Sequence, residues 1–176
     1  IVGALAVSDE QLAEQLYFIQ KSSGGICGPM DSFLTLRGIK TLHVRMQRHC
    51  ENAELIAKYL ENHPKIDTVY WPGFENHPNH EVAKKQMRGF GGMISFVPKG
   101  GSYADAIQIV ENLKLFTLAE SLGGVESLVG HPASMSHGSI PKEERQKNGL
   151  VDGLIRLSVG IEDADDLIAD LDQALN

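Results

Sequence analysis

The chain has little cysteine, and this limits the kinds of site that it can build. Its 176 residues include only Cys27 and Cys50. Two cysteines are too few for a disulfide framework, and these two lack the paired spacing of a zinc site. We therefore expect no metal centre, and we expect both thiols to be reduced, as is typical of a cytoplasmic protein.

An excess of positive charge and long apolar runs are also missing. Lys and Arg number 16 against 23 Asp and Glu, which gives a formal net charge of −7. Nucleic-acid binding needs clustered Lys and Arg against the phosphates, and a membrane-spanning helix needs about 20 apolar residues. Neither a nucleic acid nor a membrane is therefore an expected partner. No glycine-rich phosphate loop of the Walker or dinucleotide type occurs either.

What is present is the composition of an ordinary globular domain, with 42% hydrophobic and 22% charged residues. The chain opens with the apolar run Ile1–Val7, which predicts a buried strand whose pairing partners lie upstream. Ser8 is predicted to cap a helix that ends at glycines 24 and 25. We expect this beginning to belong to a larger unit, so that the chain is the C-terminal part of a longer polypeptide.

A long helix is predicted over residues 30–62 from apolar side chains at helical spacing, with a kink or break near 38–43 because Gly38 weakens it. Beyond it, strand and helix patterns alternate and predict an α/β domain: a sheet of about four strands with helices against it. The expected strands are 66–71, 91–97, 116–119, 125–129 and 154–159, and the expected helices are 80–87, 103–112, 142–148 and 163–175.

Arg156 is the first candidate site residue, because it is the only charge in the strand 154–159. Side chains alternate between the two faces of a strand, so Ile155, Leu157 and Val159 should face the core and Arg156 the opposite side. An arginine in such a setting needs an anion, and its planar fork suits a carboxylate. The pattern alone favours an internal ion pair, with Glu126 or Glu162, over a bound ligand.

The segment Glu120-Ser121-Leu122-Gly123-Gly124 is the second candidate. Its glycines permit a close approach of the backbone to a ligand, to which amide groups and the Ser121 hydroxyl could then turn. On spacing alone an ordinary turn between two strands is the stronger interpretation. Two other groups of polar residues are weaker candidates for a functional site. Ser136-His137 lacks a third orienting group, and the histidines at 77 and 80 indicate a surface loop rather than a metal site.

Four segments together resemble the Cys/Met-metabolism enzymes that depend on pyridoxal phosphate (PLP). This group includes the cystathionine γ-synthases, γ-lyases and β-lyases and the methionine γ-lyases. The resemblance extends in order over essentially all 176 residues and is carried by Leu36-Arg-Gly-Ile-Lys-Thr-Leu42 with Arg45-Met46, Lys85-Gln-Met-Arg-Gly-Phe90, Phe116–Leu128 and Leu154–Asp163.

The resemblance implies an aspartate-aminotransferase-like enzyme of fold type I, with a large PLP-binding domain and a small C-terminal domain. On this basis residues 1–29 would end the large domain, 30–62 would be a connecting helix, and 63–176 would form the small domain. The enzyme would be a homotetramer built from dimers. The lysine that holds PLP would lie upstream of Ile1, so no residue of this chain is assigned as catalytic.

Three positions match substrate-binding residues of the family. Arg156 matches the arginine that binds the substrate α-carboxylate, Ser121 matches the serine beside it, and Glu120 matches a position near the distal end of the substrate, where cystathionine enzymes tend to have Glu. The implied reaction is γ-elimination of cystathionine to cysteine, 2-oxobutanoate and ammonia. Two alternatives remain: γ-replacement of O-acyl-homoserine with cysteine, and an inactive fragment that only binds substrate or assists assembly.

Overall fold

The computed structural model describes residues 2–176, which form two compact units, Ile1–His43 and Val44–Asn176. The first unit contains two helices, α1 (Glu10–Ser23) and α2 (Pro29–Ile39). Asp9, and not the predicted Ser8, caps α1: its carboxylate accepts a hydrogen bond of 2.6 Å from the Leu12 backbone N–H. Gly24 ends the helix with a φ of 71°, in the left-handed region that glycine enters without a steric penalty.

The prediction of a buried strand over residues 1–7 is wrong for the residues that the structure describes. Residues 2–7 form no strand, and Ile1 lies outside the described residues. A strand needs backbone partners, and the first unit offers residues 2–7 only the helices α1 and α2. None of the side chains of residues 2–43 is buried, although many of them are apolar, including Leu5, Ile26 and Met30.

The long helix predicted over 30–62 is broken within the interval 38–43, where a kink or break was expected. The chain forms α2 and then α3 (Leu42–Glu61), separated by a turn at Lys40 and Thr41. The buried face of α3 belongs to the second unit, because Ala53, Ile56, Ala57 and Leu60 are fully buried in its core.

The second unit contains a sheet of five strands, which correspond to the five expected strand segments, in the order β1-β2-β5-β4-β3. Neighbours pair antiparallel except β3 and β4, which are parallel. The strands are β1 (Ile66–Tyr70), β2 (Met93–Pro98), β3 (Thr117–Leu118), β4 (Leu128–Gly130) and β5 (Ile155–Ser158); the remaining helices are α4 (His80–Gln86), α5 (Tyr103–Asn112), α6 (Lys142–Lys147) and α7 (Ala164–Leu175).

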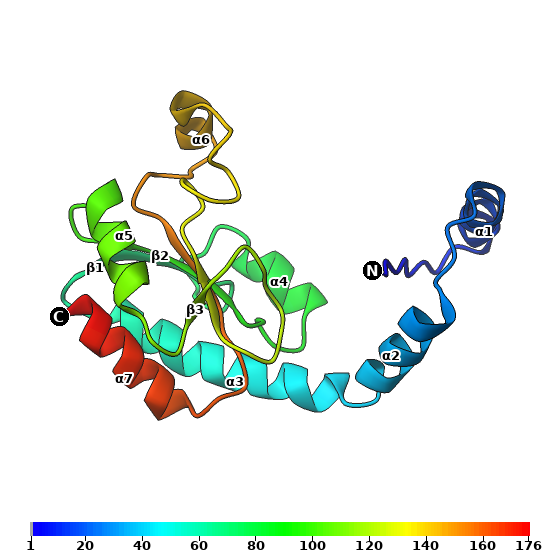
Figure 1. Ribbon diagram of the computed structural model, residues 1–176, viewed down its shortest axis with the longest axis horizontal. Coiled ribbons are helices and arrows are strands. Elements are labelled where there is room, and N and C mark those ends of the chain that lie inside the picture. The colour runs from blue at the N-terminus through cyan, green and yellow to red at the C-terminus, as the bar shows by residue number, and fades with distance from the viewer. Residues whose placement is uncertain (1) are drawn as a thin grey trace. The chain divides into compact units, whose positions relative to one another are not determined.

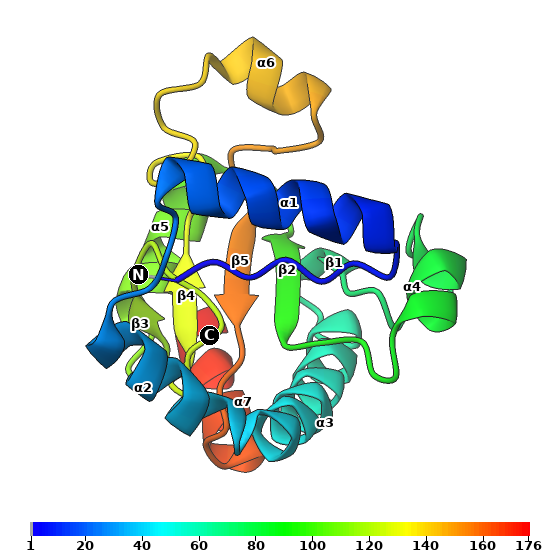
Figure 2. The same ribbon diagram turned by 90° about the vertical axis from the view of Figure 1, so that its right-hand side faces the viewer.

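One hydrophobic core joins the sheet to α3, α5 and α7. Ile155, Leu157 and Val159 pack in it, as predicted, against residues of these helices such as Ile56, Val110 and Leu171. Figure 1 shows α3 and α7 running side by side beneath the sheet, while α6 lies at the tip of a loop that projects from the unit. In Figure 2 the central strands β2, β5 and β4 are seen next to one another.

Polar contacts attach the segment after β5 to the helix α3. The ring Nδ1 of His49 lies 2.6 Å from the Val159 carbonyl oxygen, and the Asn52 amide donates to the carbonyls of Gly160 and Glu162 at 3.1 and 2.8 Å. The Glu162 carboxylate in turn accepts hydrogen bonds from the Ser127 backbone N–H at 2.6 Å and from its hydroxyl at 2.8 Å. Because the C-terminal end of β5 is held in this way, its outward side chains have a defined position.

Two absences complete the description of residues 2–176. No helix there is long and apolar enough to cross a lipid bilayer, and no group of three or more His, Cys, Asp and Glu side chains in this part of the chain is arranged to hold a metal ion.

Candidate functional site

Arg156 extends from the middle of the sheet, on the face opposite to the apolar core. In the register of β5 it pairs with Ser95 of β2 on one side and Gly130 of β4 on the other. A Cβ atom at position 130 would lie 3.7 Å from the Arg156 Nη2 atom. The glycine therefore lets the guanidinium group lie over the β4 backbone, where a larger side chain would compete with it for space.

The guanidinium has few partners of its own. Its Nη2 donates to the Ser121 carbonyl oxygen at 3.3 Å, and within residues 2–176 no carboxylate forms an ion pair with it. The internal ion pair that the sequence pattern favoured is therefore not formed, and Glu162 is instead bound to Ser127. A guanidinium carries five N–H donors, so most of those of Arg156 remain available to an anion.

The loop after β3 carries the other two predicted residues. Gly123 has a φ of 80° and donates its backbone N–H to the Ser158 hydroxyl at 2.8 Å. This bond and the Arg156–Ser121 bond hold the loop over the outer face of β5. Ser121 meets Arg156 through its carbonyl, while its exposed hydroxyl has no hydrogen-bond partner among the described residues.

Glu120 and Arg156 line one small hollow, which brings together two of the three predicted residues. A further wall comes from the start of the loop between β4 and β5, with His131, Pro132, Met135 and Ser136. From the sequence, we considered Ser136 only as part of a possible nucleophilic pair with His137. In the structure its Oγ lies 2.9 Å from the His137 Nδ1, but no third side chain among residues 2–176 orients the pair.

The wall was missed because nothing in its sequence has the periodicity of a helix or strand. Its first residue, His131, is fully buried. Its ring Nε2 lies 2.7 Å from the Asp152 carbonyl oxygen and its Nδ1 lies 2.8 Å from the Ser134 hydroxyl. The available signal in the sequence was a histidine directly after an expected strand and before a proline, and the partners of this histidine could not be inferred from it.

Asp152 forms an ion cluster at the base of the same loop. Its carboxylate pairs with Lys142, and with Arg145 at 3.0 Å. Hydrogen bonds from these two cations hold the pKa of Asp152 below its ordinary value. Arg145 also donates to the Ile140 carbonyl at 2.8 Å, so the cluster ties α6 to the chain segment that leads into β5.

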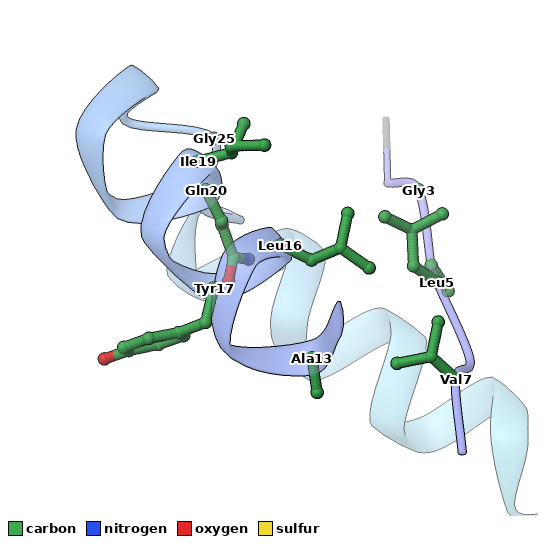
Figure 3. A pocket seen from close by; sticks show the side chains of 10 residues that line it. Gly3, Leu5, Val7, Ala13, Leu16, Tyr17, Ile19, Gln20 and Gly25 are labelled. Atoms are coloured by element: carbon green, nitrogen blue, oxygen red, sulfur yellow. The ribbon is translucent and has the colours of Figure 1, made fainter. Parts of the chain in front are cut away.

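A separate apolar pocket lies within the first unit, between residues 3–7 and α1. Figure 3 shows Leu5, Val7 and Leu16 around it. Apart from Gln20, the residues lining it are apolar, aromatic or glycine. It lacks a charged group that could fix a polar ligand, so its character is that of a packing surface.

Comparisons with known proteins agree with the sheet. The chain superposes, with a TM-score of 0.88 and 48% identity over 95% of its length, on a cystathionine γ-synthase from Xanthomonas oryzae pv. oryzae, crystallised with aminoacrylate and cysteine; it covers 43% of that chain. The fold is therefore that of the C-terminal part of a fold type I enzyme, an α/β unit with a mainly antiparallel sheet.

The model of the family described as "Cys/Met metabolism PLP-dependent enzyme" matches residues 1–176, and the chain belongs to this family. It is 56% identical to a cystathionine γ-lyase from Bacillus subtilis, over 99% of this chain and 46% of that protein, and 56% identical to a cystathionine β-lyase from Coxiella burnetii, with the same shares. An L-methionine γ-lyase from Fusobacterium nucleatum is 50% identical over 99% of this chain. The chain thus spans less than half the length of these relatives.

Proposed function

We propose that the full-length protein containing this chain is a PLP-dependent carbon–sulfur lyase of trans-sulfuration, which cleaves the Cγ–S bond of cystathionine to give cysteine, 2-oxobutanoate and ammonia. The observation that carries the proposal is the Arg156 guanidinium, which lies beside a hollow with most of its donors unpaired. Membership of the family supports the cofactor and the class of chemistry.

Arg156 would bind the α-carboxylate of the amino-acid substrate through paired N–H donors. Its strand is hydrogen-bonded on both sides, so the bound carboxylate would have a fixed orientation, and this favours alignment of the substrate Cα–H bond for proton removal. Ser121 would bind beside the carboxylate through its free hydroxyl. Glu120, exposed at the rim of the hollow, would meet the distal amino group of cystathionine.

The described residues do not fit a complete PLP site. No lysine lines the hollow that contains Arg156, and PLP enzymes bind their cofactor through a lysine. Bound PLP would supply the sink for electrons from the substrate Cα. We therefore assign this chain the carboxylate half of the site and place the cofactor lysine in the part of the protein outside it.

The first unit supports that division. Most of its large apolar side chains are exposed and none is buried in residues 2–43, and a large exposed apolar surface is typical of an interface. The expected partners are the N-terminal part of the same enzyme and further copies in a homotetramer. A cytoplasmic location also stays a prediction.

A γ-synthase reaction is the second candidate, favoured by the TM-score of 0.88 with a solved cystathionine γ-synthase. A product assay distinguishes the two in the full-length protein: cystathionine is supplied alone, and O-acyl-homoserine is supplied together with cysteine. Release of 2-oxobutanoate from cystathionine supports the lyase, and formation of cystathionine in the second mixture supports the synthase. An inactive fragment would give neither product.

The role of Arg156 is tested by Arg156→Ala, with Arg156→Lys beside it. Loss of a charge partner from a buried carboxylate pair costs roughly 2–5 kcal/mol of substrate binding. Lysine keeps the charge but not the fork, so it should restore only part of the affinity. The visible absorption of bound PLP should persist in both variants. Unchanged substrate affinity in Arg156→Ala would refute the assignment.

A further inference from the structure

The loop between β4 and β5 is closed at its base by one buried histidine. The chain leaves β4 at His131, extends through α6, and returns to β5 through Asp152. The contact of 2.7 Å between the His131 Nε2 and the Asp152 carbonyl joins these two points. Residues 132–136 directly follow the histidine and include Pro132, Met135 and Ser136, which line the hollow with Glu120.

The partners of the His131 ring fix the donor at Nε2. A carbonyl oxygen can only accept, so the Nε2–H group donates to the Asp152 carbonyl. The other ring nitrogen, Nδ1, lies 2.8 Å from the Ser134 hydroxyl, which is closer than the 3.4 Å between that hydroxyl and the His131 carbonyl. The Tyr103 ring packs edge-on against the imidazole, with 4.9 Å between ring centroids. Both ring nitrogens are therefore paired and the ring is packed.

The acceptor side of this contact is rigid as well. The Asp152 side chain is bound by Lys142 and Arg145, and the next residue, Gly153, lies against another turn of backbone. A Cβ atom at Gly153 would be 2.5 Å from the Gly101 carbonyl oxygen, a distance that real Cβ atoms do not adopt. The Asp152 carbonyl is thus held from both sides and serves as a fixed anchor.

We infer that His131 is a positioning residue for the carboxylate site: by binding Asp152 it holds residues 132–136 against the Arg156 hollow. The inference rests on the proposed role of Arg156 in binding a substrate carboxylate. His131 does not need to touch the substrate. Its contribution is to keep the wall in place before the ligand arrives, so that less ordering is needed on binding.

The test compares His131→Ala with His131→Gln in the full-length protein. The glutamine amide can reach the place of Nε2 and keep the donor to Asp152, whereas alanine removes it. Loss of one such hydrogen bond should raise KM for the amino-acid substrate about tenfold, with a much smaller change in kcat. Glutamine should recover most of this loss. Amide hydrogen exchange in residues 132–138 should accelerate in the alanine variant and less in the glutamine variant.

His80→Gln is the matched control. His80 is also buried, and its Nδ1 lies 2.8 Å from the Pro72 carbonyl, but it does not line the hollow. This variant should leave KM and exchange in 132–138 unchanged. A KM for His131→Ala equal to that of the unmodified protein would overturn the inference, as would a fall in kcat without a rise in KM.

A decarboxylated analogue of the substrate separates the two proposals. The unmodified protein should bind the amino acid more tightly than this amine, and His131→Ala should reduce that preference. If the unmodified protein shows no preference for the carboxylate, the proposed function fails. If it shows the preference and His131→Ala keeps all of it, only the positioning role fails.

Discussion

The two faces of β5 differ in how completely their side chains are satisfied. On one face Ile155, Leu157 and Val159 have exposed fractions of 0, 0 and 1% within a continuous core. On the other face Arg156 is half-buried and makes one hydrogen bond. The unused donors of Arg156 add nothing to the stability of the fold. The comparison therefore separates a face of β5 that stabilises the fold from a face that is free to bind a ligand.

Leu157→Ala should have the largest effect on stability. Removing a fully buried leucine typically costs about 2–5 kcal/mol, because the lost contacts leave a cavity. Native-state amide hydrogen exchange in β2 and β5 of the full-length protein measures this cost. Arg156→Met, one residue away, is the matched variant and should change the same opening free energy by less than about 1 kcal/mol. Equal losses in both variants would show that Arg156 is structural.

Asp170→Ala should have the next largest effect. This buried carboxylate of α7 accepts hydrogen bonds from the backbone N–H groups of Lys114, Leu115 and Phe116, at distances from 2.7 to 3.1 Å. Without it the buried donors lose their partner, at a cost of roughly 1–3 kcal/mol for an unsatisfied group. Faster exchange of the amides at 114–116 is the expected signal. Asp172→Ala, at an exposed position on the same helix, is the control and should leave these three amides protected.

These contacts show where prediction from sequence ends. The alternation in 154–159 correctly placed Arg156 opposite Leu157, and the helix expected over 163–175 is found as α7, because both depend only on local periodicity. Asp170 lies on the same helix, but its partners are 54 to 56 residues away. The choice between Ser8 and Asp9 as helix cap was equally undetermined, since both side chains can accept from the first turn.

The candidate site divides in the same way. Arg156, Ser121 and Glu120 were identified from a pattern and a resemblance, whereas His131 and Asp152 were not. The loop that joins them has no hydrophobic period, and its closure depends on contacts between residues 21 positions apart. A sequence pattern reports which face a residue occupies; it does not report which distant backbone atom the residue will meet.

The Tyr59 hydroxyl, on the side of the sheet that the helices cover, should make a smaller contribution to stability. Its hydroxyl donates to the Asp172 carboxylate at 2.8 Å. Burial, followed by the hydrogen bond and the charge of Asp172, raises the pKa of Tyr59 well above its ordinary value. The folded state therefore holds this proton more tightly than the unfolded state, and its contribution is complete below pH of about 10 and lost as the pH rises above that value. Tyr59→Phe should make the free energy of unfolding fall less steeply at alkaline pH, as measured by denaturation curves. At neutral pH the same variant should change the free energy of unfolding by no more than about 1 kcal/mol.

Asp152 should give the smallest effect and the most local one, on the side of the binding face. Lys142 and Arg145 hold the pKa of its carboxyl below the ordinary value, so its contribution is present above pH of about 4 and is lost as the pH falls through the lowered pKa. Acid should therefore open the loop 131–153 before it opens the core. Hydrogen exchange measured from about pH 5 down to about pH 2 should show earlier loss of protection in this loop than in β2 and β5. Asp152→Asn should remove this difference in pH dependence between the loop and the strands. If the core strands and the loop opened together in acid, the two faces of β5 would not be independent. The face that stabilises the fold and the face that binds the ligand could then not be separated.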